Sequence, residues 1–280
     1  MNETVKVTIP YIKDKKNKNI PITMLTAYDY PSAVLVDQAG IDIILVGDTL
    51  GMTVLGYSST LPVTVDEILY HSKMVARATK RAFLIADMPF LSYQTGSPDA
   101  IRNAGRFLKE AGMDAVKLEG GEVVTDIIKS ISDFGIPVMG HIGLTPQSVK
   151  KFGGYHVQGK TVQQADILLK DALALEKAGC FSIVLEAIPS PVAKKISREI
   201  SIPTIGIGAG PHCNGQVLVF HDLLGISESF VPKFVKQYAH LHKIILNALQ
   251  NYRNEVEKGK FPATRHCYKM SKGELKKLLS

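Results

Sequence analysis

The sequence predicts an α/β protein, a single (β/α)8 TIM barrel over residues 1–280 with an extra helix near its C-terminal end. Three observations carry this prediction: eight short apolar runs, helical patterns between most of them, and a length near the roughly 250 residues usual for such a barrel. Parallel strands can only be joined by crossovers, so this alternation indicates a parallel sheet covered by helices. Eight strands favour closure, with a doubly wound open sheet as the alternative.

The eight runs are bounded by turn residues and are apolar or β-branched, as expected of buried strands. They lie at 22–26, 42–46, 82–86, 114–118, 137–140, 181–185, 203–207 and 217–220. The link between the last two runs, residues 208–216, leaves room only for a single helical turn and is the weakest part of the barrel prediction.

Helix starts have recognisable signatures. We expect capping boxes or a capping hydroxyl before a proline at four of them: Thr64 with Glu67, Thr161 with Gln164, Ser97 before Pro98, and Ser190 before Pro191. After the last run, an apolar stripe from Val231 to Tyr252 predicts the extra C-terminal helix. This stripe would pack on the barrel or on another subunit.

The net charge of +7 is concentrated at the two ends of the chain. Residues 1–20 carry +3, residues 253–280 carry +5, and the remainder carries −1. The middle of the chain therefore has no electrostatic preference for nucleic acid, and we expect the basic N-terminal segment and the basic tail, within about 231–280, to be solvated.

Cysteine usage and hydropathy exclude two further classes. Three separated cysteines with no C-x-x-C pair indicate reduced thiols rather than disulfide staples or a zinc site. No stretch approaches the roughly 20 apolar residues that span a bilayer, and no apolar segment follows the basic start. We expect a soluble, cytoplasmic protein without a membrane partner.

Polar side chains stop five of the apolar runs, where a barrel of this kind places its reacting groups. They are Asp48, Asp87, Glu119, His141 and Glu186. Taken singly, an aspartate after a strand is most simply a helix cap or a turn residue. Five such strand ends together favour a site, and Lys117, two residues before Glu119, should face the barrel axis with it.

Carboxylates that converge at one barrel mouth repel one another unless a cation lies between them. All-oxygen ligands with open positions favour Mg²⁺. His141 could be a further ligand, a proton donor or a histidine bonded to the backbone. A metal with Lys117 and Glu186 nearby suggests removal of a proton next to the carbonyl of a 2-oxo acid, with Glu186 as the base.

The glycine run IGIGAG at 205–210 does not fit a dinucleotide-binding motif, because Pro211 stands where the last glycine is required. Its glycines allow either close approach of the backbone to a ligand or a tight turn.

The sequence resembles the ketopantoate hydroxymethyltransferase family over roughly residues 5–265. The matching strings, in order, are MLTAYDYPSA at 24–33, LVGDTLGM at 45–52, STLPVTVDEILYH at 59–71, ADMPF at 86–90, AVKLEGG at 115–121, MGHIGLTPQS at 139–148, IGIGAG at 205–210 and GQVLVFHDLLG at 215–225. So many long strings in register make a chance match negligible.

The resemblance implies Mg²⁺-dependent transfer of a hydroxymethyl group from 5,10-methylenetetrahydrofolate to 3-methyl-2-oxobutanoate, which gives 2-dehydropantoate for coenzyme A synthesis. It implies that Asp48, Asp87 and Glu119 are metal ligands, and that Glu186 is the proton acceptor. Substrate-binding residues would be Asp48, Thr49, Asp87 and Lys117. It also implies a homo-oligomer, commonly a decamer of two pentameric rings.

Three positions depart from the family pattern. Thr49 stands where serine is usual, and Ser58 and Asn214 replace acids. Two other functions remain alternatives: a metal-dependent lyase or mutase that forms an enolate on the same architecture, and a non-catalytic protein whose basic ends bind an acidic partner.

Overall fold

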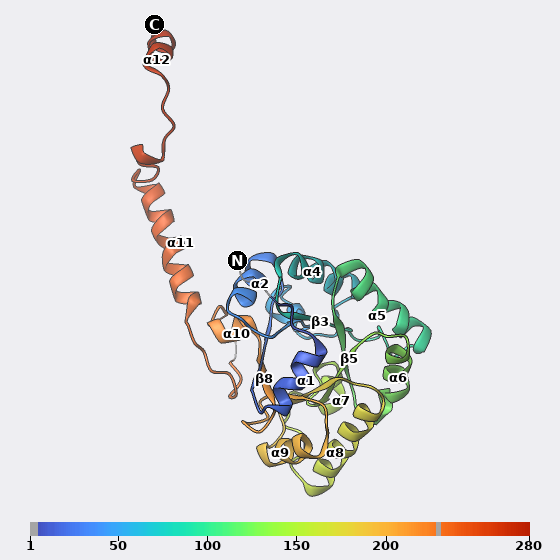
Figure 1. The fold of residues 1–280 in the computed structure, drawn as a ribbon. Coiled ribbons are helices and arrows are strands. Elements are labelled where there is room, and N and C mark those ends of the chain that lie inside the picture. The colour runs from blue at the N-terminus through green and yellow to red at the C-terminus, as the bar shows by residue number, and fades with distance from the viewer. Residues whose placement is uncertain (1–4, 228–230) are drawn as a thin grey trace.

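The computed structural model describes residues 5–227 and 231–280. Its centre is a closed barrel of eight parallel strands in chain order, so the open-sheet alternative is wrong. Figure 1 shows the helices arranged around these strands. The strands are β1 Ile22–Thr26, β2 Ile43–Val46, β3 Phe83–Asp87, β4 Ala115–Glu119, β5 Val138–Gly143, β6 Ser182–Glu186, β7 Thr204–Ile207 and β8 Gly215–Leu218.

The final strand lies earlier in the chain than the apolar run at 217–220 predicted. Gly215 pairs with Ile22 of β1 and Ile205 of β7, and these pairings define the strand although glycine is not apolar. A Cβ on Gly215 would come within 2.5 Å of the Ile22 carbonyl oxygen, so only glycine allows this approach. Residues 208–214, which are long enough for a single helical turn, form turns and bends and contain no helix.

Helices fill the crossovers and continue beyond the barrel. The α-helices are α1 Ile9–Asn17, α2 Tyr30–Gln38, α3 Leu50–Thr53, α4 Val65–Ala78, α5 Ser97–Ala111, α6 Thr125–Asp133, α7 Val149–Phe152, α8 Val162–Lys177, α9 Ser190–Glu199, α10 Phe220–Leu224, α11 Leu241–Glu257 and α12 Lys272–Leu279. Short 3-10 helices are η1 Glu122–Val124, η2 Pro146–Ser148 and η3 Thr264–His266.

Two of the four predicted helix caps are confirmed. Thr64 and Thr161 both form capping boxes, and Thr64 N donates to Glu67 Oε2 at 2.7 Å. The capping role of Ser97 and Ser190 was wrong: each is the first residue of its helix, and neither helix has a side-chain cap. In both helices the following proline is the second residue, where its fixed φ suits the first turn.

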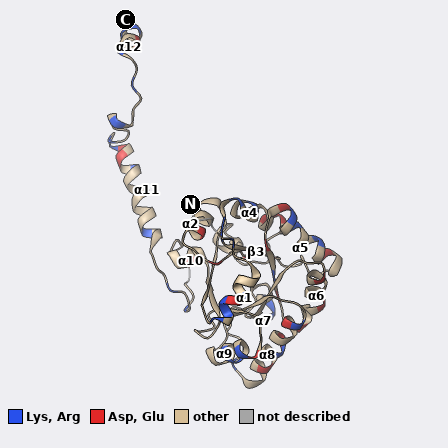
Figure 2. Ribbon diagram, viewed as in Figure 1, with Lys and Arg blue, Asp and Glu red and all other residues tan. Residues whose placement is uncertain are grey.

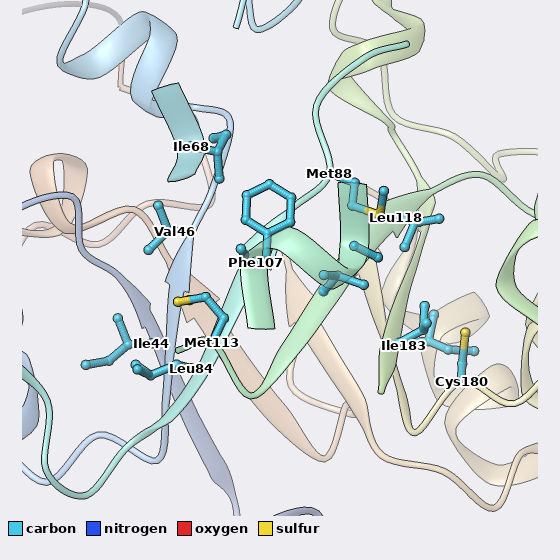
Figure 3. Packing of buried hydrophobic residues seen from close by; sticks show 14 of the residues in the cluster. Ile44, Val46, Ile68, Leu84, Met88, Phe107, Met113, Leu118, Cys180 and Ile183 are labelled. Carbon is cyan, nitrogen blue, oxygen red and sulfur yellow. The ribbon is translucent and has the colours of Figure 1, made fainter. Parts of the chain in front are cut away.

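The strands divide the core into two apolar clusters. Side chains that point into the barrel form one cluster, which includes Ile43, Ile85 and Ile205. Side chains that point outward pack under the helices, and Figure 3 shows Phe107 of α5 among Ile68, Met88 and other members of this larger cluster. Successive strand residues face opposite sides, so each strand contributes to both clusters.

The N-terminal segment closes the barrel beneath the amino ends of the strands. Val7 and Ile12 are buried in the inner cluster, and Lys15 Nζ lies 2.6 Å from Asp42 Oδ2. Lys16 Nζ donates to the carbonyl oxygens of Ile200 and Ile202. The expectation of a solvated basic segment is therefore wrong for Lys15 and Lys16, whereas Lys13 and Lys18 are exposed; residues 1–4 lie outside the described residues.

The C-terminal helix begins later than predicted. Residues 231–240 are not helical, because their backbone bonds to the region of α10: Tyr238 N donates to the Leu223 carbonyl and His242 N to the Gly225 carbonyl. Phe234 packs over Gly208, where a Cβ would meet its ring at 2.8 Å. Helix α11 then extends away from the barrel with no buried residue, so it does not pack on its own barrel (Figure 1).

The outer helices carry charges of both signs, and the described helices are not long and apolar enough to cross a membrane. Acidic and basic residues both occur on the outer helices, including α5 and α6 (Figure 2). Across residues 5–227 and 231–280, no helix is long and apolar enough to cross a membrane. The three cysteines, Cys180, Cys213 and Cys267, are unpaired.

Candidate active site

The strand register brings the polar strand ends together. Asp87 pairs with Lys117 across β3 and β4, and Glu119 pairs with His141 across β4 and β5. Adjacent partners in a parallel sheet point to the same face, here the barrel interior. One small cavity of about 50 Å³ is lined by all seven residues expected at the site: Asp48, Thr49, Asp87, Lys117, Glu119, His141 and Glu186.

Lys117 is the buried cation of this cluster. Its Nζ lies 2.7 Å from Asp87 Oδ1 and 3.3 Å from His141 Nδ1, and only 4% of the residue is exposed. Burial opposes its charge, but the carboxylates of Asp87, Glu119 and Asp48 outweigh burial and raise the pKa of Lys117. The lysine therefore stays protonated and offers positive charge to an anionic ligand.

His141 lies between two carboxylates. Its Nδ1 is 3.3 Å from Glu119 Oε1, and its Nε2 is 3.1 Å from Glu186 Oε2. Of the three readings left open by the sequence, attachment to the backbone finds no support in these contacts. Glu186 itself lies at the rim, with 16% of its side chain exposed, where it can reach both the cavity and a ligand.

Asp48 follows β2 and is tied to two other segments. Its backbone N donates to Asp87 Oδ2 at 2.9 Å, and its own Oδ2 accepts from Gln147 Nε2 at 2.9 Å. Burial, followed by the charges of Asp87 and Glu119, raises the pKa of Asp48 well above its usual range. Burial also raises the pKa of Asp87 against the opposing charge of Lys117.

These raised pKa values test whether the residues suit a divalent metal. Asp48, Asp87 and Glu119 form a buried set of oxygen donors. The pKa values of the two aspartates remain raised despite the positive charge of Lys117, so the buried carboxylates are not fully neutralised by it. A hard cation would neutralise them further, so the donor chemistry fits Mg²⁺. In the side-chain positions of the described residues, no three His, Cys, Asp or Glu groups are already arranged around a common ion.

Two buried residues at the site had no role in the sequence analysis. Gln147 lies in η2, and Tyr93 follows β3; their side chains are joined by a 2.8 Å hydrogen bond from Tyr93 Oη to Gln147 Oε1. Gln147 belongs to the family-like string at 139–148, which was its only sequence signal. Tyr93 lies outside all the matching strings and had none.

Two of the departures from the family pattern now have a location. Thr49 is one of the residues that line the cavity. Asn214 Oδ1 accepts hydrogen bonds from Thr204 N at 3.0 Å and from Thr204 Oγ1 at 3.1 Å, and so ties the turn before β8 to β7. An amide oxygen serves here as well as a carboxylate oxygen. Nothing in the structure explains Ser58.

Comparison with known proteins agrees with this arrangement of residues. A family model described as ketopantoate hydroxymethyltransferase matches residues 6–264. The chain belongs to the ketopantoate hydroxymethyltransferase family. Curated relatives named 3-methyl-2-oxobutanoate hydroxymethyltransferase include one from Syntrophomonas wolfei, 56% identical over 98% of this chain and 99% of its own length, and one from Clostridium botulinum, 53% identical over 98% and 100%.

Solved structures with the same fold are more distant from this ketopantoate hydroxymethyltransferase family member. They include a phosphonopyruvate hydrolase complex with oxalate and Mg²⁺, at a TM-score of 0.60 and 12% identity over 92% of both chains. A 2,3-dimethylmalate lyase of the PEP mutase/isocitrate lyase superfamily has a TM-score of 0.56 and 15% identity over 97% of this chain and 94% of its own. These similarities establish the barrel fold alone.

Proposed function

We propose that this protein transfers a hydroxymethyl group from 5,10-methylenetetrahydrofolate to 3-methyl-2-oxobutanoate and forms 2-dehydropantoate in pantothenate synthesis. The observation that carries the proposal is the convergence of Asp48, Asp87, Lys117, Glu119 and Glu186 on one cavity, in a member of a family whose curated relatives bear this activity in their names. The fold alone is also compatible with lyases and mutases.

In the proposed mechanism, Asp48, Asp87 and Glu119 would hold Mg²⁺. When bound, this ion supplies positive charge that polarises the 2-oxo carbonyl and stabilises an enolate. The substrate is oriented by Asp48, Thr49, Asp87 and Lys117, and the ammonium of Lys117 offsets the negative charge that develops on the oxo acid.

Glu186 removes the proton from C3 of the oxo acid, and His141, 3.1 Å away, orients its carboxylate. The one-carbon unit is released from both folate nitrogens, N5 and N10, forms a new bond to C3 of the oxo acid and takes its hydroxyl from one water. The proton removed from C3 and the remaining proton of that water go to the two folate nitrogens. A general base of this kind typically contributes about 10² to 10⁴ in rate.

The decisive assay measures 2-dehydropantoate formation from 3-methyl-2-oxobutanoate and 5,10-methylenetetrahydrofolate, with and without EDTA. We expect turnover that EDTA abolishes and added Mg²⁺ restores. Full activity in EDTA would refute the metal role. Cleavage or rearrangement of a 2-oxo acid without folate, in place of transfer, would favour the lyase or mutase alternative.

We further propose that the protein is a homo-oligomer, of the decameric kind that the family resemblance implies. Support comes from α11, whose residues Ile245, Leu249, Tyr252 and Val256 recur at spacings of four, three and four and so form one apolar face. All four side chains are exposed in the single chain. An exposed apolar stripe of this kind marks a surface that another protein surface covers. Sedimentation velocity of the full chain and of a Leu249→Lys, Tyr252→Lys variant tests this proposal. We expect the variant to sediment as a smaller species than the unsubstituted protein. An unsubstituted protein that sediments as a monomer would contradict the proposal.

A further inference from the structure

Gln147 is a buried polar residue that the catalytic roles above do not use. It lies in η2, four residues after the end of β5, and only 6% of it is exposed. A buried side-chain amide is costly unless its donors and acceptors are satisfied, so its partners indicate what it is there to hold.

The orientation of the Gln147 amide follows from its neighbours. One Nε2 hydrogen bond goes to the backbone carbonyl oxygen of Met88 at 3.0 Å, which can only accept, so this atom must be the nitrogen. The second Nε2 bond, at 2.9 Å, goes to Asp48 Oδ2. The amide oxygen, on the opposite side, accepts from Tyr93 Oη at 2.8 Å.

The backbone of the same residue binds a second acid of the site. Gln147 N donates to Glu119 Oε2 at 3.0 Å, while Tyr93 Oη accepts from Glu119 N at 3.2 Å. Gln147 therefore links Asp48, at the end of β2, with Glu119, at the end of β4. Gln147 holds one oxygen of each carboxylate, Oδ2 of Asp48 and Oε2 of Glu119.

We propose that Gln147 is a positioning residue that fixes Asp48 and Glu119 relative to each other for a shared divalent cation, and that Tyr93 fixes the Gln147 amide. This inference rests on the proposed metal role of the two acids. Hydrogen-bond partners behind metal ligands typically change metal affinity by about 10- to 100-fold when they are replaced.

The primary experiment is calorimetric titration of Mg²⁺ into the full chain, first treated with EDTA and then freed of it. Gln147→Met keeps the length of the side chain but removes the amide hydrogen bonds to Met88, Asp48 and Tyr93. We expect its Mg²⁺ dissociation constant to rise about 10- to 100-fold. Gln163→Met is the matched control, because Gln163 is exposed on α8, and its Mg²⁺ affinity should equal that of the unsubstituted protein.

The thermal melting curve without metal separates positioning from folding. If Gln147→Met does not fold, Gln147→Asn keeps an amide but draws it back by one methylene, and the same weakening is expected. Turnover of a folded variant should recover more at saturating than at limiting Mg²⁺, which a simple loss of folded protein would not produce. Unchanged Mg²⁺ affinity in a folded variant overturns the role of Gln147.

Tyr93→Phe tests the outer part of the arrangement. This variant keeps the buried ring and removes only the hydroxyl, so we expect a smaller loss of Mg²⁺ affinity than for Gln147→Met. Tyr93 Oη contacts the Gln147 amide and also the Glu119 backbone, so only the part of the Tyr93→Phe effect that acts through the amide should be lost in the Gln147→Met background. Equal effects in both backgrounds would contradict the role of Tyr93. Absence of Mg²⁺ binding by the unsubstituted protein would instead refute the proposed metal function itself.

Discussion

The imidazole of His141 contacts two carboxylates with different proposed roles. Nε2 lies 3.1 Å from Glu186 Oε2, and Nδ1 lies 3.3 Å from Glu119 Oε1. Burial and the charge of Lys117 lower the pKa of His141, but its close contacts with the carboxylates of Glu119 and Glu186 outweigh them and raise it to about 9. A cationic imidazole at neutral pH would orient the Glu186 carboxylate as a base.

Replacement of Glu186, the proposed base, should stop proton removal but leave the binding of metal and substrate nearly unchanged. For Glu186→Gln, we expect binding of Mg²⁺ and oxo acid within about threefold of the unsubstituted protein, and a loss of about 10² to 10⁴ in the rate of C3 hydrogen exchange. Proton NMR of 3-methyl-2-oxobutanoate in deuterated water, with Mg²⁺ and without folate, measures this exchange.

Glu199→Gln is the control for this substitution, because Glu199 is exposed at the end of α9. Its exchange rate should match that of the unsubstituted protein. Retained exchange in Glu186→Gln would move the role of base to another residue, and absence of exchange in the unsubstituted protein at any Mg²⁺ concentration would count against the enolate.

Loss of one carboxylate should weaken the metal site. For Asp48→Ala, we expect the Mg²⁺ concentration for half-maximal turnover to rise at least tenfold, because one proposed oxygen ligand is removed. Asp126→Ala on α6 is the exposed control. Metal dependence of turnover gives the measurement, and an unchanged requirement for Mg²⁺ in Asp48→Ala would remove this residue from the ligand set.

The hydroxyl of Thr49 can be tested separately from its methyl group. Thr49→Ser keeps the hydroxyl and should change KM for the oxo acid by less than about threefold. Thr49→Val keeps the shape and loses the hydroxyl; a lost hydrogen bond of about 1 to 1.5 kcal/mol predicts roughly a tenfold rise in KM. Steady-state kinetics distinguish the two, and equal KM values would show that the hydroxyl does not bind substrate.

A prediction for stability concerns Asp42 beneath the barrel, which bonds to Lys15, Thr23 and Arg81. Burial works against its charge, but these bonds outweigh burial and lower the pKa of Asp42. Its unfolded pKa is about 3.9, so its ionised form adds stability above that pH, and this stability disappears as the pH falls through the lower folded pKa.

We therefore expect Asp42→Asn to reduce the free energy of unfolding by about 2 kcal/mol at pH 6, as for loss of hydrogen bonds to a charged group. The difference from the unsubstituted protein should shrink below about pH 4. Urea unfolding at several pH values gives both quantities. A difference that stays constant down to pH 2 would show that Asp42 is not ionised through these contacts.

The barrel and most site residues followed from local patterns. Every strand except β8 coincides with a short apolar run, and Asp87, Glu119 and Glu186 end such runs, so their shared location at the carboxyl ends follows from parallel topology. The capping boxes at Thr64 and Thr161 depend on residues three apart and were equally readable.

Features that depend on contacts distant in sequence were not predictable. Gln147 meets Asp48 across 99 residues, and Lys16 meets Ile202 across 186, with no local signal for either bond. Residues 231–240 have a helical apolar pattern, but hydrogen bonds to the α10 region hold them in another conformation. In each case the tertiary partner decides the structure, and the partner is invisible in a local window.

Alternate residues of β4 serve two different purposes: one set packs in the core and so supports thermal stability, and the other lines the cavity of the site. Val116 and Leu118 face the helices, while Lys117 and Glu119, one residue away, face the cavity. Substitutions in the helix-facing layer can therefore be chosen for a higher melting temperature while the reacting groups stay in place. A one-residue shift of this strand would instead exchange the two layers, and both core packing and the site would be lost.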